Sequence, residues 1–122
     1  MNKFSETSEG SNKTEPSTYV FLYVTFPSKD SAQNIITALL QARLIACANV
    51  FPPISSYYMW KGSLEHEQEV SAILKTKSDF FNQIEDHITT HHPYDTPCIV
   101  EIPIHQISAP FAGWLDKKLK ER

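Results

Sequence analysis

The stretch Thr18 to Phe26, TYVFLYVTF, is an almost unbroken run of β-branched and aromatic residues. Such a run is typical of a strand that is buried on both faces, so we predict that it lies in the centre of a sheet. Pro27 and Ser28 end the run, and Ser28 is a suitable N-cap for a helix. The apolar residues that follow recur at helical spacing and should face a core: Ala32, Ile35, Ile36, Leu39 and Leu40.

A short strand and a β-hairpin are predicted next. Residues 46–51 predict a strand that ends at Pro52, which cannot donate a hydrogen bond to a neighbouring strand. The segments ISSYYMW (54–60) and HEQEVSAILKTK (66–77) flank the turn KGS and predict the hairpin. Its outer part is rich in aromatic residues and runs past what the first helix can cover.

A second helix should begin at Ser78 or Asp79, either of which can act as its N-cap. We expect it to end near His91, because the residue before Pro93 disfavours helical angles. Its inward residues are predicted to be Phe80, Phe81, Ile84 and Ile88.

The segment CIVEIPI (98–104) predicts the last main strand, and APFAGWLDKKLKER (109–122) predicts a terminal helix. The order strand, helix, strand, strand, helix, strand is that of an α+β fold, the ferredoxin-like split βαβ sandwich. We therefore predict an antiparallel sheet with helices on one face and a C-terminal helix. The other face needs a partner, and self-assembly is the simplest source of one.

Composition restricts the class of protein. With 122 residues and 41% hydrophobic content, the chain suits one domain, predicted at residues 18–122 after a flexible tail at residues 1–17. The net charge of -3 provides no basic field for nucleic acid or anionic lipid. No apolar stretch reaches the roughly 18 residues of a membrane span. The two cysteines, Cys47 and Cys98, form no C-x-x-C pair, and reduced thiols predict a cytoplasmic protein.

Four residues are candidate metal ligands. His87 and His91 stand four apart, and therefore on one helix face, at the spacing of two zinc or copper ligands. His92 and Cys98 follow closely, and imidazole and thiolate donors favour copper. We expect copper or another divalent ion to bind some combination of these four. The simpler interpretation is a solvated helix flank beside a cysteine that packs as a small hydrophobe.

A second group of candidates lies on the hairpin. Glu69 and Lys75 share a sheet face but lie roughly 20 Å apart along one strand, so each needs a partner from elsewhere. Tyr58 and Trp60 share a face by strand alternation. One interpretation is that these four residues bind a ligand. The other is that Glu69 and Lys75 are solvated strand ends, while Tyr58 and Trp60 pack in an interface.

Three motifs, in this order and spacing, resemble the CutA divalent-cation tolerance family: RLIACANVFPPISSYYMWKG (43–62), EVSAILKT (69–76) and HHPYDTPCIVEIPI (91–104). The resemblance extends from about Thr25 through Trp114. It implies homotrimers of ferredoxin-like subunits, similar in architecture to PII signalling proteins, linked to tolerance of copper and other divalent metals, with no established enzymatic activity.

The family pattern falls on Cys47, Ser56, Tyr58, Trp60, Gly62, Glu69, Lys75, Thr76, His92, Pro93, Tyr94, Pro97 and Trp114. The resemblance groups six of them around a cleft between subunits, with Glu69 and Lys75 as a charged pair: Tyr58, Trp60, Glu69, Lys75, His92 and Tyr94.

Our leading hypothesis is therefore a trimeric protein that binds copper or another divalent ion and acts in metal tolerance. The alternative is a PII-like small-molecule sensor without a metal requirement. A hydrolase or lyase using His92 with Tyr94 or Glu69 is disfavoured, because the chain shows no complete set of nucleophile, base and orienting group. We expect no enzyme.

Overall fold

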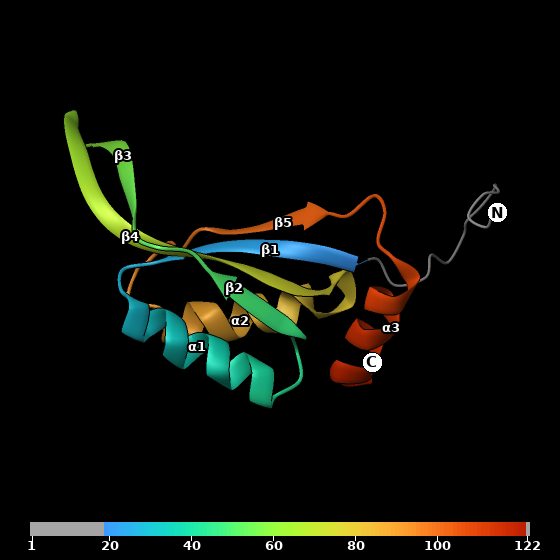
Figure 1. Ribbon diagram of the computed structural model, residues 1–122. Coiled ribbons are helices and arrows are strands. Elements are labelled where there is room, and N and C mark those ends of the chain that lie inside the picture. Colours follow the sequence, from blue (N-terminus) through green and yellow to red (C-terminus); the bar gives the residue numbers. More distant parts are fainter. Residues whose placement is uncertain (1–18, 122) are drawn as a thin grey trace.

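The structure, a computed structural model, describes residues 19–121, and the tail predicted at residues 1–17 lies outside this range. Figure 1 shows an antiparallel sheet with α1 and α2 on one of its faces. This is the predicted ferredoxin-like α+β sandwich with a C-terminal helix. The elements are, in order, β1 (Tyr19–Phe26), α1 (Lys29–Gln41), β2 (Cys47–Val50), β3 (Ile54–Trp60), β4 (Ser63–Lys77), the 3-10 turn η1 (Ser78–Phe80), α2 (Phe81–His91), β5 (Ile99–Pro103) and α3 (Ala109–Lys118).

β1 is central, as predicted. It pairs with β4 on one side and β5 on the other, in the order β2-β4-β1-β5, while β3 pairs with the outer part of β4. Side chains of β1 alternate between the buried side under the helices and the open side, where Phe21 and Tyr23 are half-buried. Burial of β1 on both faces is thus incomplete in a single copy: within residues 19–121, α3 contacts the open face where β1 begins, and no helix covers the rest of that face.

α1 begins where the sequence predicts. The Ser28 hydroxyl accepts a hydrogen bond from the Ser31 backbone N–H at 3.1 Å, which caps the helix. Four of the five predicted inward residues of α1 are buried, but Leu40 is 39% exposed, so its inward placement is wrong. Leu40 lies one position past Leu39, which turns its side chain beyond the buried stripe.

The start of α2 differs from the prediction. The residue at the N-cap of α2 is Phe80, and neither Ser78 nor Asp79 caps this helix. η1 comes between them, and the Ser78 hydroxyl donates to the half-buried carboxylate of Glu101 on β5, 3.1 Å away. The hydroxyl therefore satisfies a buried acceptor instead of a helix end.

The hairpin β3–β4 turns over two residues with positive φ, Lys61 at 50° and Gly62 at 82°. Such a turn matches the twist of paired strands, and glycine accepts it without strain. The hairpin extends past the ends of α1 and α2 in Figure 1. Its aromatic and aliphatic side chains are consequently exposed, including Tyr57, Met59, Trp60 and Leu64.

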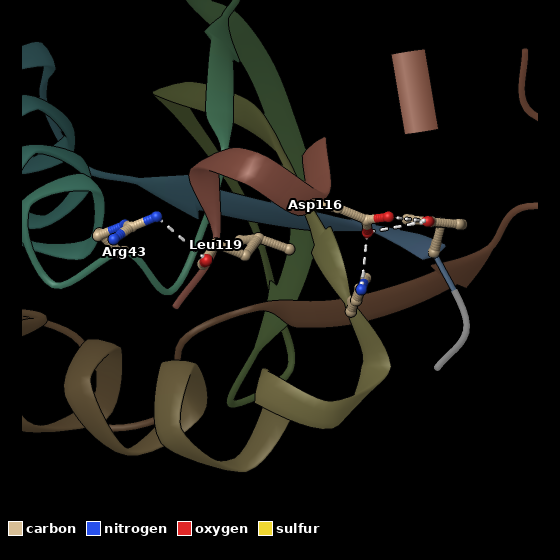
Figure 2. A network of polar contacts seen from close by, with 5 residues as sticks. Arg43, Asp116 and Leu119 are labelled. Atoms are coloured by element: carbon tan, nitrogen blue, oxygen red, sulfur yellow. Dashed lines mark hydrogen bonds and ion pairs between the residues drawn. The ribbon is translucent and has the colours of Figure 1, made fainter. Parts of the chain in front are cut away.

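α3 is fastened at the end of the sheet where β1 begins (Figure 2). The Arg43 guanidinium donates to the carbonyl oxygens of Lys117 and Lys118 at 2.8 and 3.0 Å, in the last turn of α3. Asp116 accepts from the Tyr19 hydroxyl at 2.9 Å and pairs with Lys77 at 2.7 Å. These contacts tie α3 to β1, to β4 and to the turn that follows α1.

The open face of the sheet has an apolar character. Phe21, Tyr23 and Ile73 are half-buried there, and Val100 and Ile102 of β5 are 48% and 42% exposed. None of the helices within residues 19–121 has the length and apolar character to cross a bilayer.

Candidate functional site

His92 begins the corner between α2 and β5, and its ring is buried, with 8% exposed. The Tyr94 backbone N–H donates to Nδ1 at 3.1 Å, so Nδ1 is unprotonated and Nε2 donates to the Thr25 carbonyl oxygen at 2.8 Å. The ring also stacks on Phe26, with centres 5.4 Å apart. His92 therefore fixes the corner as a neutral imidazole whose two nitrogens are both occupied.

Glu69 is the centre of what we call the Glu69 cluster: Glu69, Ser56 and Tyr94. The Ser56 hydroxyl donates to Oε1 at 2.6 Å and the Tyr94 hydroxyl donates to Oε2 at 3.0 Å. Burial and the hydrogen bond to Glu69 raise the pKa of Tyr94 to about 12. At neutral pH Tyr94 is thus a protonated donor, and the cluster contains no cation that compensates the carboxylate.

Aromatic and acidic side chains adjoin this cluster. The register pairs Ser56 with Glu67 and Tyr58 with Glu65, so the three hairpin carboxylates lie on the face of Ser56, Tyr58 and Trp60. The hydrogen bond with Glu67 raises the pKa of the exposed Tyr58 phenol. Trp60 is 59% exposed, and the Lys61 ammonium lies 5.7 Å from its ring centre. A two-residue turn at positions 61–62 fixes the register of the two hairpin strands. With that turn assumed, the sequence alone would have predicted that Glu67 lies opposite Ser56.

Lys75 lies away from the Glu69 cluster. It is on the open face of β4, with its ammonium 5.6 Å from the ring centre of Phe21 and 5.5 Å from that of Phe111. Within residues 19–121 no ion pair joins it to Glu69. A single chain therefore does not form the expected charged pair. Phe111 of α3, a contact of Lys75, was not among the residues picked out from the sequence, because its position depends on how α3 folds back.

The four candidate metal ligands separate into different surroundings. His87 and His91 are neighbours on α2, with ring centres 4.4 Å apart. Burial, and then the charge of His91, lower the pKa of His87. Cys98 is exposed as a residue, but its thiol is partly screened from solvent. This partial burial, and then the negative charge of Glu69, raise the pKa of the thiol. Within residues 19–121 no three His, Cys, Asp or Glu side chains come together in a group that could hold an ion.

The fold and these contacts define a ferredoxin-like α+β domain that carries hydroxyl, carboxylate and imidazole groups where the hairpin leaves the sheet. The sequence pattern of the CutA1 divalent ion tolerance proteins matches residues 20–118, and the chain belongs to this family.

Known relatives cover most of the chain. It is 39% identical to the divalent-cation tolerance protein CutA of Archaeoglobus fulgidus over 100 residues, 82% of this chain and 97% of that protein. The CutA protein of Pyrococcus horikoshii is 37% identical over 102 residues, 84% of this chain and 99% of that protein. The crystal structure of CutA1 from Oryza sativa superposes with a TM-score of 0.83 at 28% identity, covering 86% of this chain and 96% of that one.

Proposed function

We propose that this protein is a homotrimer that binds a divalent metal ion, copper in the first place, and acts in metal tolerance. Its relatives are named for divalent-cation tolerance, and their names include no enzymatic activity. The observation that carries the proposal is the pair of neighbouring imidazoles on α2, His87 and His91, whose ring centres lie 4.4 Å apart. This donor type fits copper and does not fit magnesium or calcium.

Assembly with two further copies of the chain is supported by the exposed apolar side chains. Tyr57 and Leu64 at the outer hairpin are 67% and 69% exposed, and the open sheet face adds Val100 and Ile102. Exposed apolar surface of this extent marks an interface in soluble proteins. Static light scattering of dilute protein tests the assembly, because a stable 13.9 kDa species would contradict it.

The Glu69 cluster supports the second candidate function, that of a small-molecule sensor without a metal requirement. Within residues 19–121 its carboxylate has two hydroxyl donors and no ion-pair partner, beside the exposed aromatic rings of Tyr58 and Trp60. In a trimer, Lys75 of a neighbouring copy would provide the charge that is missing, and His92 would hold Tyr94 in place. A ligand with a cationic or hydroxyl group would suit this arrangement.

We further propose that this protein has no catalytic activity and that it acts in the cytoplasm. The ring nitrogens of His92 are both hydrogen-bonded, and the pKa of Tyr94 is about 12, so neither group suits proton transfer near neutral pH. Free thiols at Cys47 and Cys98 are consistent with a reducing compartment. One solved relative, from Archaeoglobus fulgidus, is described as periplasmic, so fractionation of the native cell is the direct test.

Native mass spectrometry during a copper titration tests the function itself. We expect the trimer mass to persist while bound copper rises to a fixed number of ions per subunit. Calcium provides the control, since its preference for oxygen ligands predicts no saturable binding to these donors. If copper adds no mass to the trimer, the metal proposal fails and the small-molecule sensor becomes the preferred function.

A further inference from the structure

We infer that His87 and His91 form a two-imidazole site for Cu(II) on α2, separate from the Glu69 cluster and without His92 or Cys98. This inference rests on the proposed metal binding and names the side chains that carry it. Of the four candidate ligands, His87 and His91 then form the pair that binds an ion. The other two, His92 and Cys98, have other roles.

The spacing of the two rings suits a single ion. Residues four apart lie one above the other on a helix, and the ring centres of His87 and His91 are 4.4 Å apart, with their planes inclined by 32°. Two imidazoles on adjacent positions of one ion, with metal–nitrogen bonds of about 2.0 Å, have ring centres roughly 4 to 5 Å apart. α2 therefore holds the rings near the required separation without unwinding.

Each of the two rings also has a nitrogen lone pair that is available to coordinate an ion. His91 Nδ1 donates to the His87 carbonyl oxygen at 2.9 Å, which leaves the lone pair on Nε2 of His91 free. A hydrogen bond of this kind fixes the tautomer and orientation of a ligating imidazole. Within residues 19–121, neither ring nitrogen of His87 has a hydrogen-bond partner. Both side chains can thus bind an ion without breaking a contact of the fold.

His92 lacks this freedom, and Cys98 does not join the His87–His91 pair. Coordination by His92 would require the loss of its bond from the Tyr94 N–H or its bond to the Thr25 carbonyl, inside the buried corner. Cys98 lies beside Glu69 and not beside the His87–His91 pair. The pair is therefore left with water at the other positions of the ion.

Copper is the ion that such a site selects. Imidazole nitrogen suits Cu(II), Ni(II) and Zn(II), and among divalent ions of the first transition row Cu(II) binds a given nitrogen site most tightly. A site with only two protein ligands imposes little geometry, so the intrinsic order of affinities decides the outcome. We expect Cu(II) to bind more tightly than Ni(II) and Zn(II), and Ca(II) not to bind.

The test is calorimetric titration of the full-length protein with Cu(II) in a buffer that does not coordinate copper, together with electron paramagnetic resonance of the bound ion. The variants are His87→Ala and His91→Ala, and the matched control is His105→Ala, an exposed histidine outside the helices. Each helical variant should weaken Cu(II) binding by at least about tenfold, whereas the control should bind like the parent. The parent spectrum should show two nitrogen ligands, and each helical variant should lose one.

Circular dichroism checks that the alanine variants keep their helix content. Alanine favours the helix at both positions, so α2 should remain folded and a loss of Cu(II) binding would not reflect unfolding. If parent and double variant bind Cu(II) equally, the His87–His91 site is refuted while metal binding by the protein stands. If Cys98→Ser abolishes binding, the site is likewise refuted in favour of a thiolate site. If the parent binds no copper, the inference and the proposed function fail together.

Discussion

The two ends of the sheet differ in how their polar groups are satisfied. Where β1 begins, Asp116 pairs with the cation of Lys77, and the Arg43 guanidinium binds the carbonyl oxygens that end α3. Where β1 ends, among the residues that the structure describes, the Glu69 carboxylate has neutral hydroxyl partners only, and both ring nitrogens of His87 and Nε2 of His91 have no hydrogen-bond partner.

This difference separates stability from binding. Polar groups that are already paired within the chain have few atoms available to bind a ligand. The contacts at the α3 end therefore serve to hold the fold together. A carboxylate without a cation and imidazoles that each keep an unoccupied ring nitrogen retain their capacity for a ligand or an ion. The cavity of about 320 Å³ between α1 and α3 does not change this assignment, because the guanidinium of Arg43 that lines it is already bound to carbonyl oxygens.

The largest effect that we predict comes from substitution of His92, which serves stability at the end of the sheet where we propose binding. His92→Ala should lower the free energy of unfolding by about 2 to 3 kcal/mol, because the buried Thr25 carbonyl and Tyr94 N–H lose their partner. Urea denaturation measures it. The control, His105→Ala, is exposed and should stay within about 0.5 kcal/mol of the parent. A His92 variant as stable as this control would mean that the corner is not fixed by the ring.

At the α3 end, Arg43→Ala should cost about 1 to 3 kcal/mol through the loss of hydrogen bonds to the α3 carbonyls. Arg43 has φ of 60°, so Arg43→Gly removes the same guanidinium but relieves backbone strain. The glycine variant should therefore be more stable than the alanine variant by about 1 kcal/mol in the same denaturation experiment. Equal stability of the two would show that the backbone at Arg43 is unstrained.

Tyr94→Phe should lower the free energy of unfolding by about 1 kcal/mol, because the phenol no longer donates to Glu69. The pKa of Tyr94 is raised from an ordinary value of 10.0 to about 12. Since the folded state holds this proton more tightly, its contribution is full below pH 10 and declines as pH rises to 12. Ultraviolet titration of the parent and of Tyr57→Phe should show a phenol that ionises near pH 12, which Tyr94→Phe lacks. A parent without a late step would contradict the buried hydrogen bond.

Asp116→Asn should have the smallest effect, about 0.2 to 1 kcal/mol at neutral pH, because the ion pair with Lys77 is half exposed to solvent. The hydrogen bond from Lys77 holds the pKa of Asp116 below its ordinary value of 3.8. Its stabilisation is therefore present above that value and lost as acid titrates the folded carboxyl. Parent and variant should converge in stability at low pH, whereas Asp95→Asn, at an exposed position, should change nothing. A difference that persists in acid would exclude the ion pair as its cause.

Local patterns in the sequence predict most of the fold. The run TYVFLYVTF with Ser28 placed β1 and the start of α1, and the spacing around KGS placed the hairpin. These signals succeed because each depends on neighbours within one or two turns of the chain. The cap at Ser78 failed because a carboxylate from a strand distant in the sequence, at Glu101, takes its hydroxyl.

The contacts of the candidate site depend on such distant partners throughout. The bond between Tyr94 and Glu69 joins residues 25 positions apart, and its existence depends on the path of the corner after α2. The buried ring of His92 and the exposed ring of His91 are adjacent in sequence and identical in type, so no local pattern distinguishes them. Only the direction in which the chain leaves the helix decides which imidazole is available.

The most direct test of the difference between the two ends is the proton–nitrogen NMR spectrum of the protein during addition of substoichiometric Cu(II). A paramagnetic ion broadens the signals of nearby amides, so it reports its own position. We expect amides around His87 and His91 to lose intensity first, while those of α3 around Asp116 keep theirs. Broadening that begins at α3, or that affects the two ends equally, would contradict the assignment of binding to one end and stability to the other.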